Sequence, residues 1–184
     1  MGQRPPRRGS PQRVHVPVEE AWDTRGRIVF IAGPGQSRLT AMKVEFRKLD
    51  AGASLPGYAH GGDAGLDLSA NADIELQPGE RALVPTGLAV ALPEGHAGLV
   101  LPRSGLASNH GITLINAPGL IDSGYRGEIT IAVVNLDRER PYNITRGERI
   151  AQLLVVPFIA LEPMEVVDLT DTARGTGGFG STGS

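Results

Sequence analysis

The stretch GLAVALPEGHAGLVLP, residues 87–102, sets two apolar segments on either side of a Pro-Glu-Gly turn. Each segment is only six or seven residues long, and the turn between them is Pro93–Gly95. Short apolar runs that end at Pro and Gly are typical of β-strands rather than helices. The stretch therefore predicts two strands joined by a tight turn.

The same alternation of strand and turn continues on both sides of this stretch. Strand patterns are found at residues 66–70, 73–77, 81–85, 112–116, 128–136, 142–145 and 149–158, and another begins at Met42. Signals for helices are almost absent, although Ser104–Gly111 could hold one helical turn that ends at Gly111. Many short strands at close spacing predict an all-β fold, either a sandwich, a jelly roll or a barrel.

Composition excludes several classes of protein. The 184 residues include no Cys, which rules out disulfides and thiol nucleophiles and fits a reducing compartment, so we expect a cytoplasmic protein. The net charge of −2 argues against a general nucleic-acid binder. No apolar run approaches the ~20 residues of a membrane span, so we expect neither nucleic acid nor membrane as a partner.

The first 41 residues differ from the rest of the chain. They hold seven Arg and three acidic residues, and they begin with a segment rich in Pro, Arg and Gly. This composition predicts a disordered extension, within which residues 27–33 could form a short strand. We expect the folded domain to span residues 42–169 and to be followed by an arm at residues 170–184. We also expect the extension to be dispensable, or absent if translation begins at Met42.

Two strand ends carry polar side chains suited to binding anions. In AGLDL, Asp67 faces away from Leu66 and Leu68, and taken alone it would be a solvent-facing residue. In PRSGLA, residues 102–107, Arg103, Ser104 and Gly105 place a guanidinium, a hydroxyl and free backbone N–H groups together. By itself, this segment could equally be an ordinary turn.

Two further stretches place polar side chains among apolar ones. In NAPGLIDSGYRGE, residues 116–128, Asp122 follows Ile121, and Tyr125 and Arg126 lie between glycines. Asp122 could act in an active site or could cap a turn. RIAQLL, residues 149–154, carries Arg149 and Gln152 three positions apart, which predicts that they point to opposite faces. An ion pair between Arg149 and a carboxylate is the structural alternative.

The chain ends in RGTGGFGSTGS, residues 174–184, which cannot build a core of its own. Its glycines allow backbone amides to approach a phosphate, Arg174 can bind phosphate oxygens, and Phe179 offers a face for a base. A disordered terminus is the alternative. No metal-ligand spacing involves the four His and no phosphate-binding loop of the G-x-x-x-x-G-K-[ST] type occurs, so a metal ion such as Mg²⁺ must be held by carboxylates, water or a substrate.

Together and in this order, PRSGLA, GLIDSGYRGE, RIAQL and RGTGGFGSTG, with AGLDL before them, resemble the five motifs of the trimeric dUTPase family. The resemblance runs from about Met42 to the C-terminus. It implies a distorted jelly-roll β-barrel, a homotrimer with active sites at subunit interfaces, and a flexible Gly-rich C-terminal arm that closes over the site. It also implies Mg²⁺-assisted hydrolysis of dUTP to dUMP and diphosphate.

The resemblance assigns roles by position. Asp122 would activate the attacking water, Asn116 would read uracil, and Tyr125 would pack under the deoxyribose and exclude a 2′-hydroxyl. Asp67 would act through water around the magnesium ion. Phe179 would lie over the uracil. The remaining residues would bind the substrate, chiefly its phosphates, and they are Arg103, Ser104, Gly105, Gln152, Arg174, Gly180, Ser181 and Thr182.

Two alternatives remain open at this point. The dCTP deaminases share the fold, but they carry a catalytic Glu three residues before an Asn, where this sequence has Ala132 before Asn135. A non-catalytic nucleotide-binding module is the second alternative, and the presence of Asp122 together with the complete tail argues against it.

Overall fold

The computed structural model describes residues 42–172 and 175–176, together with the backbone of two short strands nearer the N-terminus. These two strands, β1 (Glu19–Trp22) and β2 (Ile28–Ile31), pair antiparallel. The sequence predicted a short strand at residues 27–33, whereas it gave no signal for β1. The division into extension, β-domain and arm stays a prediction.

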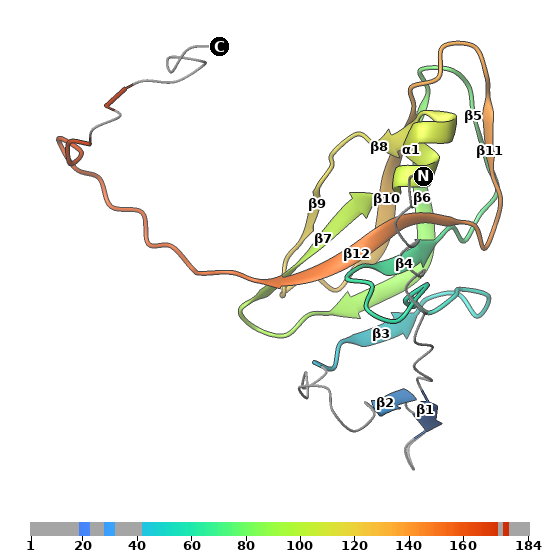
Figure 1. The fold of residues 1–184 in the computed structure, drawn as a ribbon, viewed down its shortest axis with the longest axis horizontal. Helices are drawn as coiled ribbons and strands as arrows, with labels where there is room; N and C mark the ends of the chain where they lie inside the picture. Colours follow the sequence, from blue (N-terminus) through green and yellow to red (C-terminus); the bar gives the residue numbers. More distant parts are fainter. Residues whose placement is uncertain (1–18, 23–27, 32–41, 173–174, 177–184) are drawn as a thin grey trace, which may run out of the picture.

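Two four-stranded antiparallel sheets make up the body of the domain (Figure 1). The first has the order β3-β6-β10-β8, with β3 at Glu45–Lys48, β6 at Arg81–Ala91, β10 at Glu128–Asn135 and β8 at Ile112–Leu114. The second has the order β4-β12-β7-β9, with β4 at Leu66–Ser69, β12 at Arg149–Pro157, β7 at His96–Pro102 and β9 at Gly119–Ile121. A smaller pair joins β5 (Ile74–Leu76) to β11 (Tyr142–Ile144).

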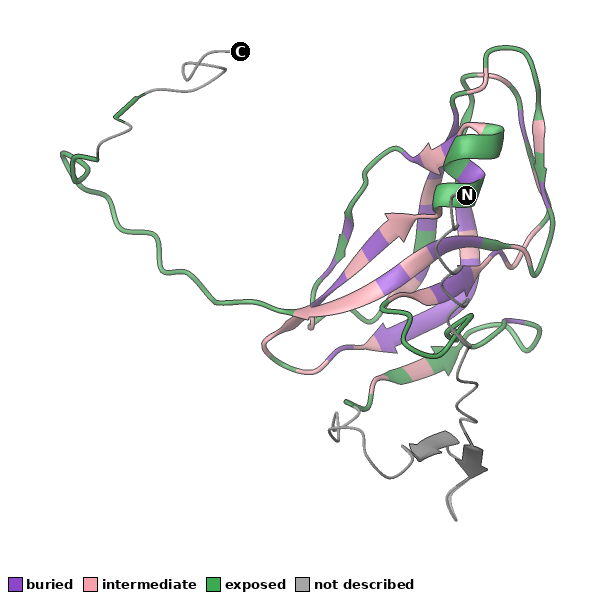
Figure 2. Cartoon of the chain, in the orientation of Figure 1, coloured by how far each residue is buried: buried purple, intermediate pink, exposed green. Residues whose placement is uncertain are grey.

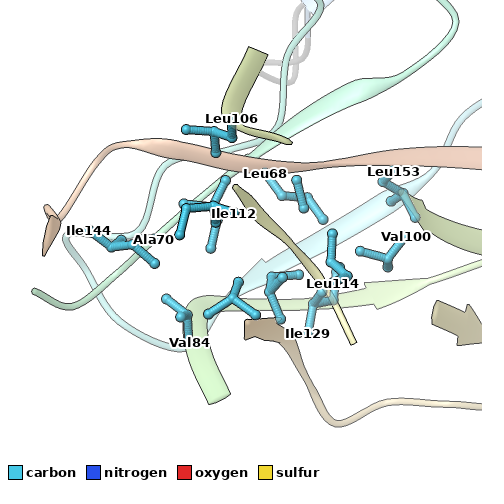
Figure 3. Close-up of a cluster of buried hydrophobic side chains, with 14 of the residues drawn as sticks. Leu68, Ala70, Val84, Val100, Leu106, Ile112, Leu114, Ile129, Ile144 and Leu153 are labelled. Carbon is cyan, nitrogen blue, oxygen red and sulfur yellow. The ribbon is translucent and has the colours of Figure 1, made fainter. Parts of the chain in front are cut away.

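Apolar side chains from both sheets form one core cluster. Along β10, Ile129, Ile131 and Val133 are buried at every second position, as expected for a strand with one face on the core. They join a buried cluster that includes Leu68 of β4 and Leu153 of β12, and Figure 3 shows part of it. The purple segments of Figure 2 accordingly follow the inner strands, whereas the connecting loops are mostly exposed. This burial supplies the main driving force for folding.

The short helix α1 (Ser104–His110) follows β7 directly. Leu106 anchors it to the core, and it ends at Gly111, whose φ of 67° lies in the left-handed region that favours glycine. The amide of Gly111 donates to the carbonyl of Ala107 at 3.1 Å, which closes the last turn. The predicted helical turn ending at Gly111 is confirmed.

The fold is nearly all-β, as the sequence predicts, with three differences in detail. The segments predicted as separate strands at 81–85 and 87–93 form one strand, β6, which is irregular at Gly87, where φ is 68° and the pairing with β10 shifts register. Strand β9 was not predicted, because it begins at Gly119, directly after Pro118, and this pair is typical of a turn. Within the described residues the strands form separate sheets rather than a closed barrel.

The chain leaves the body of the domain after β12. Residues 158–169 run away from both sheets as an extended segment with no strand or helix (Figure 1). Of the segments that the structure describes, none is a helix long and apolar enough to span a membrane.

Candidate active site

The first polar cluster centres on Asp67 of β4. Only 6% of this residue is exposed, and its carboxylate accepts hydrogen bonds from Arg149 Nη1 at 2.8 Å and from Gln152 Nε2 at 3.4 Å. The guanidinium of Arg103 forms an ion pair with it, Nε to Oδ1, at 3.4 Å. The expectation that Asp67, taken alone, faces solvent is therefore wrong. These hydrogen-bond and ion-pair partners compensate the hydration that the carboxylate loses on burial.

A bulge in β12 brings Arg149 and Gln152 to the same carboxylate. Arg149 pairs with Ser69 and Ala151 pairs with Leu68, so β12 carries one more residue than β4 between these pairs. The extra residue shifts the two-residue period, and the prediction that Arg149 and Gln152 point to opposite faces is wrong for this reason. The structural alternative, an ion pair between Arg149 and a carboxylate, is present.

Arg103 is held in place by the same strand. Its Nη1 atom donates to the carbonyl of Arg149 at 2.6 Å, while its Nε atom lies beside Asp67. Two guanidinium groups thus surround one buried carboxylate, and the cluster carries an excess of positive charge. A guanidinium group donates charge-assisted hydrogen bonds that suit phosphate oxygens.

A cavity of about 410 Å³ opens beside this cluster. Asp67, Arg103 and Gln152 line it, together with Leu101 and Leu154 and the loop at residues 59–65. Sequence reasoning missed the loop, in which the amide of His60 donates to Asp63 Oδ2 at 2.8 Å. The signal was the Gly-containing YAHGGD segment, residues 58–63, directly before AGLDL.

A second cavity, of about 210 Å³, lies where β8, β9 and β10 meet. Asn116 reaches it from the turn after β8, Asp122 from the residue after β9, and Tyr125 from the following turn. All three residues are exposed. A Cβ atom on Gly119 would lie 3.3 Å from Asn116 Nδ2, so the missing side chain leaves room for the amide. The sequence-predicted carboxylate, amide and aromatic ring therefore share one site.

The turn that follows Asp122 is closed by its own hydrogen bonds. The amide of Tyr125 donates to the carbonyl of Asp122 at 3.0 Å, and the phenol of Tyr125 donates to the carbonyl of Glu128 at 2.9 Å. Arg126 Nη1 donates to the carbonyls of Ser123 and Tyr125 at 2.6 and 2.7 Å. Sequence reasoning noted Arg126 without a role, and the structure shows it bracing the turn.

The predicted site residues that line a cavity fall into two separate groups on one chain: Asp67, Arg103 and Gln152 in one, and Asn116, Asp122 and Tyr125 in the other. Val100 lines the second cavity and Leu101 the first, and consecutive strand residues point to opposite faces, so the cavities flank β7 on different sides. No residue lines both cavities. Ser104 and Gly105 are exposed at the start of α1 and line neither cavity, and a Cβ atom on Gly105 would meet only open space. The predicted residues of the tail, Arg174, Phe179, Gly180, Ser181 and Thr182, lie outside the described residues.

Behind the first cluster, Tyr142 and Glu148 form a second layer. The phenol of Tyr142 donates to Glu148 Oε1 at 2.5 Å. Burial, reinforced by the hydrogen bond to Glu148 and by its negative charge, raises the pKa of Tyr142 to about 12, against an opposing effect of Arg103. Glu148 directly precedes Arg149, so this pair ties the start of β12 to β11.

The described residues contain no group of three His, Cys, Asp or Glu side chains that could hold a metal ion. Asp67 offers the oxygen ligands that Mg²⁺ prefers, but both of its carboxylate oxygens already contact Arg or Gln. The donor set therefore fits a metal ion brought by a phosphate ligand and contacted through its water shell.

Comparison with known proteins places this geometry in a family. The family model described as dUTPase matches residues 51–183. The chain is 54% identical over 142 residues to the deoxyuridine 5'-triphosphate nucleotidohydrolase of Thermobifida fusca, a match that covers 77% of this chain and 79% of that protein. It is 57% identical over 129 residues to the enzyme of the same name from Leifsonia xyli, covering 70% and 85% of the two chains. The chain belongs to the dUTPase family.

Solved structures agree with this placement. The dUTPase of Staphylococcus bacteriophage 80alpha with dUPNHPP superimposes with a TM-score of 0.72 at 32% identity, covering 78% of this chain and all of that one. A variant dUTPase from phage phi11 of S. aureus, described for the coordination of a structural Mg(II) ion, gives a TM-score of 0.66 at 28% identity and covers 71% and 100% of the two chains.

Proposed function

We propose that this protein hydrolyses dUTP to dUMP and diphosphate. The observation that carries the proposal is the placement of Asn116, Asp122 and Tyr125 in one cavity of a dUTPase-family chain. An amide to read a base, a ring to face a sugar and a carboxylate to activate water are the groups that this reaction requires. Such an enzyme serves nucleotide metabolism, and we place it in the cytoplasm.

The two cavities are halves of one active site, completed between copies of the chain. Asp67, Arg103 and Gln152 offer phosphate contacts in one cavity, whereas Asp122 lies in the other. A substrate that must touch both groups therefore has to bridge two subunits. The homotrimer of jelly-roll subunits implied by the family resemblance supplies such a junction three times.

The segment after β12 supports assembly. It exposes a dense series of large apolar side chains, and exposed apolar surface of this kind is typical of a site that contacts another molecule. A second subunit is the surface that we propose. The exposed residues are Phe158, Ile159, Leu161, Met164, Val166, Val167 and Leu169.

The phosphate groups of dUTP fit the first cluster. Arg103 and Gln152 line the cavity, and the first N–H groups of α1, including that of Gly105, have no partner within the helix. Mg²⁺ would be held mainly by the phosphates, with Asp67 contacting its water shell, and would supply neutralisation of the triphosphate charge. Arg149 orients Asp67 for this contact by donating a hydrogen bond to its carboxylate at 2.8 Å.

Asp122 acts as the general base. It accepts the proton of a water molecule as that water attacks the α-phosphorus, and the leaving diphosphate is stabilised by the cations of the first cluster. A positioned general base contributes ~10²–10⁴-fold to the rate. Closure of the tail, with Phe179 over the uracil and Arg174 on the γ-phosphate, completes the site and excludes bulk water.

Selection against thymine and ribose depends on steric exclusion of the extra methyl or hydroxyl group. Uracil and thymine differ by one methyl group, and a pocket gains only about 1–3 kcal/mol from such a group. The turn between β8 and β9, residues 115–118, gives a backbone wall that would clash with the methyl. Tyr125 provides the corresponding wall under the sugar.

Ala132 separates this proposal from deamination. It lines the same cavity as Asp122, at the position where the related deaminases carry their catalytic Glu, and a methyl group cannot shuttle protons to a cytosine ring. The test offers each deoxynucleoside triphosphate with Mg²⁺ and measures diphosphate and ammonia. We expect diphosphate from dUTP alone. Ammonia from dCTP would favour the deaminase, and no release from any nucleotide would favour a binding module.

A further inference from the structure

Gly127 lies against the phenol end of Tyr125. A Cβ atom built on Gly127 would lie 2.6 Å from Cζ and 3.0 Å from Cε2 of Tyr125, and closer still to the phenol oxygen. These distances are shorter than a carbon atom can tolerate, so any side chain at position 127 displaces the ring. We propose that Gly127 is a specificity-determining position. Because Gly127 has no side chain, the ring of Tyr125 can pack against its backbone, and this packing site, called the seat below, holds the ring where it excludes ribose. The inference rests on the proposed function, in which Tyr125 excludes the 2′-hydroxyl.

The seat is needed because the phenol crosses residue 127 to reach its hydrogen-bond acceptor. The hydroxyl of Tyr125 donates to the carbonyl of Glu128, one residue beyond Gly127, at 2.9 Å. A ring lifted off Gly127 loses this hydrogen bond, because the hydroxyl can no longer reach that carbonyl. The position of the Tyr125 ring and its hydrogen bond to the carbonyl of Glu128 therefore both require that residue 127 has no side chain.

The acceptor itself is fixed. Glu128 begins β10 and pairs with Ala89 of β6, and its Oε1 atom accepts a hydrogen bond from the amide of Gly87 at 2.7 Å. A tether to a fixed carbonyl restrains the ring to one orientation. Rejection of a single hydroxyl requires such a rigid wall, since a mobile ring would move aside.

The role of Gly127 is steric rather than conformational. Its backbone does not adopt a positive φ, so an alanine there would not be strained by its own backbone. Gly124, on the other side of Tyr125, also lacks a positive φ, and a Cβ atom there would meet nothing within 4 Å. The two glycines therefore form a pair in which an added Cβ atom would contact the ring at one position and meet nothing at the other.

The experiment compares Gly127→Ala with Gly124→Ala and measures kcat/KM for dUTP and for UTP. We expect Gly127→Ala to lower the preference for dUTP over UTP by about tenfold, mainly through improved use of UTP, and Gly124→Ala to leave the preference within about twofold. Thermal melts of both variants check that the fold is retained. An unchanged preference in a folded Gly127→Ala enzyme would overturn the proposal.

A double-variant cycle tests whether Gly127 acts through Tyr125. In a Tyr125→Ala background the ring is gone, so adding Gly127→Ala should change the preference by less than about twofold. A further loss of preference in that background would contradict the seat. So would a fall in kcat for dUTP with an unchanged preference, which would show that Gly127 acts on Asp122 instead.

The same cycle separates the inference from the proposed function. If Tyr125→Ala alone leaves the preference unchanged, Tyr125 is not the sugar wall, and that part of the proposed function fails. If Tyr125→Ala relaxes the preference but Gly127→Ala does not, Tyr125 does exclude ribose, and the proposed role of Gly127 in positioning it is wrong.

Discussion

The guanidinium of Arg149 donates to the buried carboxylate of Asp67 at 2.8 Å across the β12–β4 pair. The contact exists only because β12 carries a bulge between Arg149 and Ala151. Arg149 also accepts a hydrogen bond from Arg103 through its own carbonyl, so this one residue contacts both Asp67 and Arg103 of the first cluster.

Arg149→Ala should therefore weaken catalysis without touching Asp122. It leaves the buried Asp67 with Arg103 as its one remaining cationic partner in the described residues, and the loss of a charged partner is costly for a buried carboxylate. We expect the Mg²⁺ concentration needed for half-maximal activity to rise and kcat/KM to fall by about 10–100-fold. Arg138→Ala, in the exposed loop after β10, is the control. An unchanged Mg²⁺ dependence would show that the Arg149–Asp67 pair has no part in binding the metal-bound substrate.

Asp122→Asn should separate binding from chemistry. The amide keeps the size of the carboxylate but cannot accept the proton of water, so kcat should fall by ~10²–10⁴-fold while the affinity for a non-hydrolysable dUTP analogue stays within a few-fold. Single-turnover kinetics and calorimetry provide the two values. Asp137→Asn, outside both cavities, is the control, and a normal kcat in Asp122→Asn would refute the base assignment.

Truncation after Ala173 should remove turnover but not assembly. The missing residues include Arg174 and Phe179, whereas the apolar segment at 158–169 remains. We expect light scattering to report a trimer and diphosphate release from dUTP to be almost lost. A truncated enzyme with normal turnover would contradict the role of the tail.

Tyr142 should titrate later than an ordinary tyrosine. Its pKa is raised to about 12 from the usual 10.0, first by burial and then by Glu148. Because the folded state favours the protonated phenol, its contribution to stability is complete below pH 10 and is lost as pH rises towards 12. Phenolate absorbance after a rapid pH jump should show one late transition that disappears in Tyr142→Phe. Titration of all the tyrosines near pH 10 would contradict the burial of Tyr142.

The sequence predicted local structure well and the joining of distant segments poorly. Strands such as β10 and β12 were visible because each is a long segment rich in apolar and β-branched residues, and α1 because Gly111 marks its end. The bulge beside Arg149 has no such signal, because it depends on the pairing of β12 with β4. The division of the site residues between two cavities was equally hidden, since it depends on which face of β7 each segment packs against.

The measurement that tests the account most directly is complementation between two inactive chains. Asp122→Asn disables one half-site and Arg103→Ala the other, so each variant alone should be inactive. Trimers reassembled from an equal mixture should recover about a quarter of normal dUTP hydrolysis, because a random neighbouring pair unites the two intact halves once in four combinations. Mixed trimers that stay inactive would contradict an active site shared between subunits.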